Sequence, residues 1–147
     1  FLYLEDKEIK NIVSLYYDSD KTQVDDLGET LKKEDFSGIE SHEKLNLQGY
    51  SVDDYIQTGE YLFKKYSQKL DTFIHCNAGS DRTGLIAAVM QFFAGFDRSL
   101  IENNAKNSGM NEVFTAQLKN ILDKLEKEQL SPKFKIKIHV NTSNNIL

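Results

Sequence analysis

Cysteine, proline and tryptophan are almost absent from this chain of 147 residues, which contains one Cys, one Pro and no Trp. A single cysteine cannot form a disulfide within the chain, so the fold needs no oxidising compartment. Long apolar runs are also missing, and none approaches the roughly 20 residues that a membrane-spanning helix requires. We therefore expect no integral membrane segment and a cytoplasmic protein, with a secreted or host-delivered form as the alternative.

Positive charges are outnumbered, because 18 Lys and Arg stand against 23 Asp and Glu, a formal net charge of −5. This balance argues against general binding of nucleic acids or of anionic membranes. It does not exclude an anionic substrate, since a few local donors can outweigh the net charge. The hydrophobic fraction of 39% is ordinary for a globular protein, and the length suits one domain. We expect a single domain over residues 1–147 and a monomer.

The apolar pattern predicts strands that alternate with helices. We expect strands around residues 9–15, 45–49, 72–75 and 133–140, and helices around 27–36, 52–66, 85–93, 100–101 and 113–125. Ser51 and Asp54 are a candidate capping pair for the helix that follows Ser51. Strands separated by helices imply an α/β fold with a central, mainly parallel sheet flanked by helices. In such sheets, ligands bind at the carboxyl ends of the strands.

The segment from His75 to Gly84 reads His-Cys-Asn-Ala-Gly-Ser-Asp-Arg-Thr-Gly and lies between a predicted strand and a predicted helix. Backbone N–H groups in such a loop can surround a phosphate dianion, aided by the positive end of the helix dipole. Gly79 permits the backbone geometry that this requires, and the planar guanidinium of Arg82 can grip two phosphate oxygens. The sequence therefore predicts a phosphate-binding loop made of Asn77, Ala78, Gly79, Ser80, Asp81 and Arg82.

Cys76 is the candidate nucleophile of this loop. A helix N-terminus and a nearby cation make a cysteine more acidic than a free thiol, so we expect a thiolate that attacks phosphorus and forms a covalent intermediate. We expect the Thr83 hydroxyl to donate to the sulfur and His75 to order the loop by hydrogen bonding. The alternative, a purely structural cysteine on a buried strand, is disfavoured by these neighbours. No second ligand lies at metal-binding spacing, so we expect no metal and no cofactor.

The pattern His-Cys-x5-Arg-Thr-Gly resembles the signature of the protein tyrosine phosphatase superfamily. This resemblance implies an α/β fold and a cysteine-dependent phosphatase that uses a phosphocysteine intermediate. Its substrates would be phosphotyrosine, with phosphoserine, phosphothreonine or phosphoinositides as further candidates. A weaker similarity to dual-specificity phosphatases spans most of residues 4–125, and it is carried by Leu4–Leu15, Glu29, Gly38-Ile39, Asn111, Phe114, Gln117 and Leu118.

The general acid is missing from the place where the resemblance puts it, about 30 residues before the cysteine. Residues Asn46 to Gln48 contain no Asp, and Asp53 and Asp54 lie in the first turn of a predicted helix, where carboxylates stabilise the helix itself. Asp81 gives the variant Cys-x-x-Gly-x-Asp-Arg-Thr, which resembles a bacterial group of tyrosine and phosphoinositide phosphatases and the myotubularins. In those families the loop Asp is thought to be the acid. We favour Asp81 for this role; the alternative is that it orients Arg82 or bonds a backbone amide.

Two other functions stay open. A pseudophosphatase would bind phosphorylated partners without turnover, and the missing upstream acid is its only support. A sulfurtransferase or arsenate reductase is disfavoured by the Arg-Thr-Gly that ends the loop. The loop itself carries no Lys, which weakens a polyphosphoinositide substrate, although Lys44, Lys64 or Lys65 could lie near its mouth. His42 and His139 have no partner at an informative spacing, and we expect surface or strand positions for both.

Overall fold

Three parallel strands form the sheet in the computed structural model of the chain. The structure describes residues 9–35, 38–47, 51–69, 71–77 and 81–128. The strands are β1 (Asn11–Tyr16), β2 (Ser41–Asn46) and β3 (Thr72–His75), in the spatial order β2-β1-β3. Both pairings are parallel, which confirms the expected α/β fold with a parallel sheet, and Ser14 on β1 lies in register with His75 on β3. The carboxyl ends of all three strands therefore meet at one edge.

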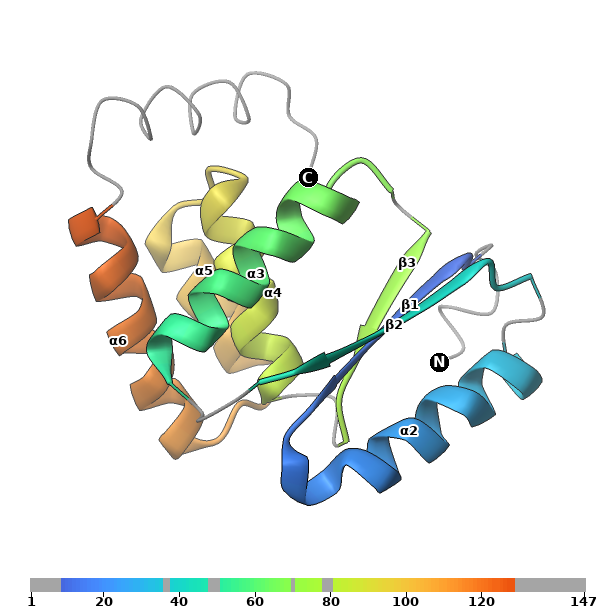
Figure 1. Cartoon of the computed structure of the whole chain (residues 1–147). Helices are drawn as coiled ribbons and strands as arrows, with labels where there is room; N and C mark the ends of the chain where they lie inside the picture. The colour runs from blue at the N-terminus through green and yellow to red at the C-terminus, as the bar shows by residue number, and fades with distance from the viewer. Residues whose placement is uncertain (1–8, 36–37, 48–50, 70, 78–80, 129–147) are drawn as a thin grey trace.

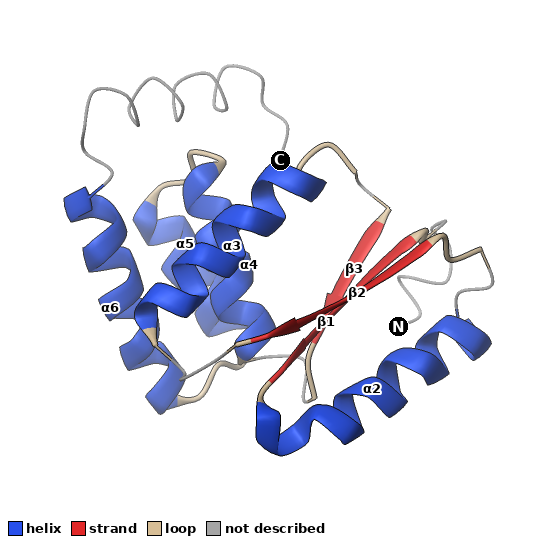
Figure 2. Cartoon of the chain, viewed as in Figure 1, coloured by secondary structure: helices blue, strands red, loops and turns tan. Residues whose placement is uncertain are grey.

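Helices cover both faces of this sheet. In chain order they are the single 3-10 turn η1 (Asp18–Asp20), α2 (Lys21–Thr30), the short π-helical η2 (Leu31–Asp35), α3 (Val52–Tyr66), α4 (Arg82–Phe93), α5 (Arg98–Asn107) and α6 (Glu112–Glu128). Helix α2 covers one face alone, whereas α3, α4, α5 and α6 gather on the other (Figures 1 and 2). None of the helices in the described ranges combines the length and the apolar character needed to cross a membrane.

The side chains of β1 are divided between two cores. Val13 and Leu15 are fully buried in the larger core, which the helices α3 to α6 complete. Ile12 faces the other way and packs with Ile9 and Leu31 in a smaller cluster on the α2 side. A central parallel strand is buried on both faces, and this explains its nearly continuous apolar sequence.

Helix α4 lies in the middle of the larger core, as its apolar sequence predicts. It contacts α3, α5 and α6. The approach of α3 is close because Gly59 faces α4: a Cβ at this position would lie 2.5 Å from Cγ1 of Val89. Helix α3 begins with the predicted capping box, in which the Asp54 amide donates to Oγ of Ser51 over 3.1 Å. The site loop therefore enters a helix that is held on several sides.

The element boundaries differ from the prediction in the polar stretches. Helix α2 begins at Lys21, earlier than the predicted start at 27, and a Lys21–Asp25 ion pair one turn apart supports its first turn. Strand β2 runs from Ser41 to Asn46 and ends before Gly49. It is half-exposed at the sheet edge, so its apolar alternation is too weak to mark its start. The predicted strand at 133–140 lies outside the described residues, as does His139.

Candidate active site

The predicted loop lies at the carboxyl edge of the sheet. Cys76 directly follows β3 and is 2% exposed, and Arg82 is the first residue of α4. The turn η1 follows β1 at the same edge, since Nδ2 of Asn46, the last residue of β2, donates to Oδ1 of Asp18 over 2.7 Å. Asn77 is exposed. Ala78, Gly79 and Ser80, three of the predicted phosphate-binding residues, lie outside the described residues.

Arg82 is held by two residues that the sequence did not single out. Its Nη2 donates to Oδ2 of Asp20 in an ion pair whose side chains are only 12% and 13% exposed, and its guanidinium lies 4.2 Å from the centre of the Tyr17 ring. Burial alone would lower the pKa of Arg82, but the hydrogen bond and charge of Asp20 outweigh it and raise the pKa. The arginine is therefore a fixed cation at the start of α4.

The other terminal nitrogen of the same guanidinium, Nη1, has no hydrogen-bond partner among the residues that the structure describes. Nη1 of Arg82 is buried and makes no hydrogen bond within the described ranges, and the same holds for Oγ1 of Thr83. The predicted bond from Thr83 to the Cys76 sulfur is thus not formed in this structure. Buried donors without partners are costly. An anionic ligand at the N-terminus of α4 would satisfy Nη1 of Arg82.

Asp81 makes contacts that the sequence left open. It occupies the N-cap position of α4, but its side chain does not cap that helix. Its carboxylate instead accepts two hydrogen bonds from Asn111, one from the backbone amide (3.3 Å) and one from Nδ2 (3.1 Å). Oδ1 of Asn111 in turn accepts from the Phe114 amide and caps the start of α6. The structure thus contains the backbone-amide bond of the alternative interpretation, and Arg82 is oriented by Asp20.

The two upstream candidates for the acid are engaged elsewhere. Asp54 completes the capping box of α3. Asp53, whose side chain is 61% exposed, pairs with Lys124 on α6. These contacts agree with the structural interpretation that the sequence favoured for both residues.

A series of hydrogen bonds reaches the backbone of Cys76 from the α2 side of the sheet. Nδ1 of His75 lies 3.2 Å from the carbonyl oxygen of Cys76, and its Nε2 lies 2.5 Å from Oγ of Ser14. The same Oγ lies 2.8 Å from Nε2 of His42, which is on β2 as expected but has a partner that the sequence did not reveal. Burial lowers the pKa of His75, so this ring is neutral at physiological pH. These are the hydrogen bonds that the predicted ordering role of His75 requires.

A small cavity lies beside Tyr17, the residue whose ring packs against the Arg82 guanidinium. Its volume is about 300 Å³, and its lining consists of Tyr17, Tyr55, Val113, Phe114 and Gln117. Burial and a hydrogen bond with the Tyr17 hydroxyl raise the pKa of Tyr55, so the Tyr55 hydroxyl stays protonated. Because Tyr17 also stacks on Arg82, the aromatic wall of the cavity is continuous with the cation.

The lysines considered as additional phosphate-binding groups all have acidic partners. Lys44 lies near Asp25 and Glu29, Lys64 pairs with Glu60, and Lys65 pairs with Glu43. Across the part of the chain that the structure describes, no group of three or more His, Cys, Asp or Glu side chains is placed to hold a metal ion.

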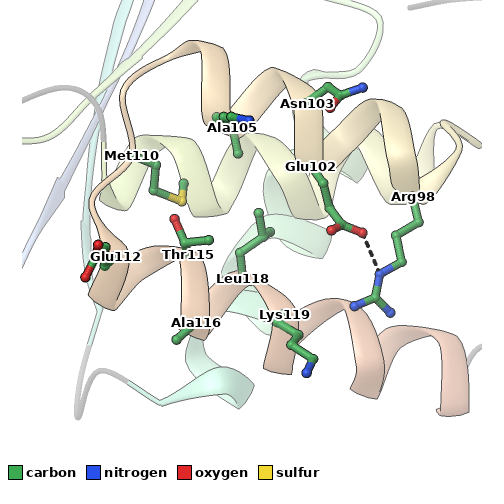
Figure 3. A pocket seen from close by; sticks show the side chains of 11 residues that line it. Arg98, Glu102, Asn103, Ala105, Met110, Glu112, Thr115, Ala116, Leu118 and Lys119 are labelled. Atoms are coloured by element: carbon green, nitrogen blue, oxygen red, sulfur yellow. Dashed lines mark hydrogen bonds and ion pairs between the residues drawn. The ribbon is translucent and has the colours of Figure 1, made fainter.

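A larger cavity lies apart from this chemistry. It has a volume of about 680 Å³ and opens between α5 and α6 (Figure 3). Arg98, paired with Glu102, is at one end, and Met110 and Leu118 provide apolar walls. None of its lining residues belongs to the His75–Gly84 segment, so the candidate site is defined by Cys76 and Arg82 and not by the volume of the hollow.

A sequence model of the tyrosine phosphatase family matches residues 7–144 of the chain. The match covers both the loop and the elements that hold it, so the chain belongs to the tyrosine phosphatase family. Membership of this family supports phosphatase activity in general and implies phosphorylated substrates. No curated protein matches the chain.

Proposed function

We propose that this member of the tyrosine phosphatase family hydrolyses phosphate monoesters through a phosphocysteine intermediate, as a tyrosine or dual-specificity type of enzyme. One observation carries the proposal: buried Cys76 directly follows β3, and at the start of α4 Asp20 holds Nη2 of Arg82 while Nη1 stays without a partner among the described residues. That arrangement supports a nucleophile in front of an anion-binding position.

In the proposed reaction the Cys76 sulfur attacks phosphorus, the S–P bond forms and the ester P–O bond breaks. The leaving oxygen takes a proton from Asp81. Water then attacks phosphorus and gives a proton to the Asp81 carboxylate, the S–P bond breaks, and inorganic phosphate and the thiolate are released, with Asp81 protonated again. The Nη1 edge of Arg82 and the first N–H groups of α4, which no Asp81 side chain caps, hold the charge of the transferring group. The Thr83 hydroxyl donates to the sulfur as it leaves.

Phosphotyrosine is the substrate that we favour, with phosphoserine, phosphothreonine and phosphoinositides as alternatives. The cavity of about 300 Å³ beside Tyr17 offers the rings of Tyr17, Tyr55 and Phe114 to an aromatic leaving group. The acidic partners of Lys44 and Lys65 weaken the case for a polyphosphorylated headgroup.

A pseudophosphatase is the second candidate, because Asn111 already occupies the Asp81 carboxylate with two hydrogen bonds. Such a protein would hold phosphorylated partners through Arg82 and leave them intact.

Hydrolysis of an aryl phosphate separates the two candidates. We expect turnover that vanadate inhibits, that EDTA leaves unchanged and that Cys76→Ser abolishes. A wild-type chain that binds a phosphotyrosine peptide but shows no turnover would contradict the enzyme and support the binding module. The acid is tested with Asp81→Asn against Asp53→Asn and Asp54→Asn on an ester with a poor leaving group. Loss confined to the latter two variants would exclude Asp81.

A further inference from the structure

We infer that Ser14 and His42 are positioning residues for the nucleophile, acting through His75 on the backbone of Cys76. The inference rests on the proposed phosphocysteine chemistry, but its contacts are independent of the bound substrate. They form one chain of hydrogen bonds that crosses all three strands, from Glu29 on α2 to the Cys76 carbonyl.

The hydrogen-bonded side chains of this series are buried in the α2 face of the sheet. Ser14 is fully buried and His75 is 4% exposed, while the His42 side chain is 6% exposed. Helix α2 packs directly on them at Gly28, where a Cβ would lie 2.8 Å from Cε1 of His42 and 2.9 Å from Oγ of Ser14. These polar groups therefore have little access to water, and each depends on the others for its hydrogen bonds.

The single hydroxyl proton of Ser14 decides which groups in this series of hydrogen bonds donate and which accept. The neutral His75 ring carries a single N–H, and it must sit on Nδ1 if it is to donate to the Cys76 carbonyl. Nε2 is then an acceptor, and it accepts a hydrogen bond from the Ser14 hydroxyl. Since that proton is used, Oγ of Ser14 can only accept from His42, which must carry a proton on Nε2. The bond to Cys76 thus requires an N–H from His42.

Glu29 competes for the proton of His42. Its Oε1 lies 3.5 Å from Nδ1 of His42, and it favours a proton on that nitrogen. A neutral His42 with its proton on Nδ1 would reverse the chain: Ser14 would donate to His42, His75 would donate to Ser14, and Nδ1 of His75 would lose its hydrogen toward Cys76. The imidazolium form of His42 satisfies both ends, because it donates from both nitrogens.

The charged groups around His42 come from every element that packs on it. Glu29 and Asp25 on α2 favour the imidazolium, whereas Lys44 on β2 and Lys32 on η2 oppose it. His75 on β3 is the remaining titratable neighbour, and its ring is neutral. Burial is the strongest influence, and it lowers the pKa of His42. The imidazolium form of His42, which can donate to both Glu29 and Ser14, is therefore favoured as pH falls through this lowered pKa. Above this pKa His42 has one N–H, and Glu29 and Ser14 compete for it.

The test compares Ser14→Ala, His42→Leu and His42→Gln with the control Thr72→Val. The amide N–H of a glutamine can replace the Nε2–H donor, whereas leucine cannot. Thr72 is on β3, and its buried Oγ1 has no partner in the described ranges. Removing this hydroxyl therefore breaks none of the hydrogen bonds that link His42, Ser14 and His75. Each variant is assayed for kcat/KM on an aryl phosphate, for the rate of Cys76 alkylation by iodoacetamide, and for Tm.

We expect Ser14→Ala and His42→Leu to lower kcat/KM by about 10-fold or more, as is typical of residues that orient a reacting group without contacting the substrate. Alkylation should slow in parallel, His42→Gln should restore most of both rates, and Thr72→Val should match the wild type. Folded Ser14→Ala and His42→Leu variants with wild-type rates would overturn the inference. If Ser14→Ala does not fold, the His42 pair decides the question. If the wild type has no turnover, the proposed function fails, and the alkylation rates still test the positioning role.

Discussion

The ion pair between Asp20 and Arg82 gives the sharpest test of the site, through the substitution Asp20→Asn. Oδ1 of Asp20 accepts from the Tyr17 amide over 2.9 Å, and Oδ2 accepts from Arg82. Asparagine keeps the shape and the first of these bonds. It turns the second oxygen into an NH₂ donor that faces the donors of Arg82. The guanidinium therefore loses its hydrogen-bond acceptor, while the turn η1 keeps its capping contact.

The expected loss of stability follows from burial. Removing one partner of a fully buried pair costs about 3–5 kcal/mol, but these side chains are 12% and 13% exposed and the substitution is isosteric. We expect about 2 kcal/mol, within the range for hydrogen bonds to charged groups. For a domain of this size that is a fall in Tm of about 4–8 °C. Displacement of the arginine by about 1 Å would lower kcat/KM on an aryl phosphate by about 100-fold.

Asp123→Asn is the matched control, because Asp123 also pairs with an arginine, Arg98, over 2.8 Å. In that pair the side chains are 54% and 27% exposed. An exposed pair contributes under about 1 kcal/mol, so we expect little change in Tm and none in kcat/KM. The reasoning is refuted if Asp20→Asn lowers Tm as expected and leaves kcat/KM at the wild-type value. Asp20 would then stabilise the fold without positioning the arginine.

Three further predictions concern the acid, the helix packing and the pH dependence. Asn111→Ala and Asp81→Asn should each lower kcat more on a poor leaving group than on a good one, and the double variant should lose no more than the worse single variant. Gly59→Ala should lower the free energy of unfolding by about 1–3 kcal/mol through overpacking against α4, whereas Gly38→Ala, with nothing within 4 Å of its Cβ, should not; equal denaturation midpoints would contradict this. Burial would raise the pKa of Glu43, but two tyrosine hydroxyls and a lysine that bind it lower the pKa below its ordinary value. It therefore stabilises the fold above its unfolded pKa and loses that contribution as pH falls through the folded one, so Glu43→Gln should destabilise the chain at pH 7 and less at about pH 3.

The local part of the site can be predicted from the sequence, because its signals are contiguous. Strand β3 feeds a loop that opens an apolar helix, and this order alone places Cys76 and Arg82. The partners of these residues are distant in the chain. Asp20 lies 62 residues from Arg82, and Ser14 lies 61 residues from His75. Nothing in the periodicity of β1 shows which loop its carboxyl end will meet, since that depends on the order β2-β1-β3.

The register of the edge strand β2 is another feature that could not be predicted from the sequence. His42 reaches Ser14 only because β2 begins at Ser41, and the half-exposed sequence of β2 does not mark that start. A shift of one residue would turn His42 to the other face of the sheet. Its expected strand position is correct, but the hydrogen bond that gives it significance is set by register, which turn length and packing decide.

The anchors of the site come from separate elements, and this ties ligand binding to the fold. The turn after β1 holds Arg82 through Asp20, and the turn between α5 and α6 holds Asp81 through Asn111. Once these contacts are made, Nη1 of Arg82 and Oγ1 of Thr83 are the buried site donors that have no partner in the described part of the chain. Each such donor costs about 1–3 kcal/mol while it is unsatisfied. A phosphate that accepts from Nη1 of Arg82 removes this cost only in the folded chain, so substrate binding and the packing of both turns stabilise each other.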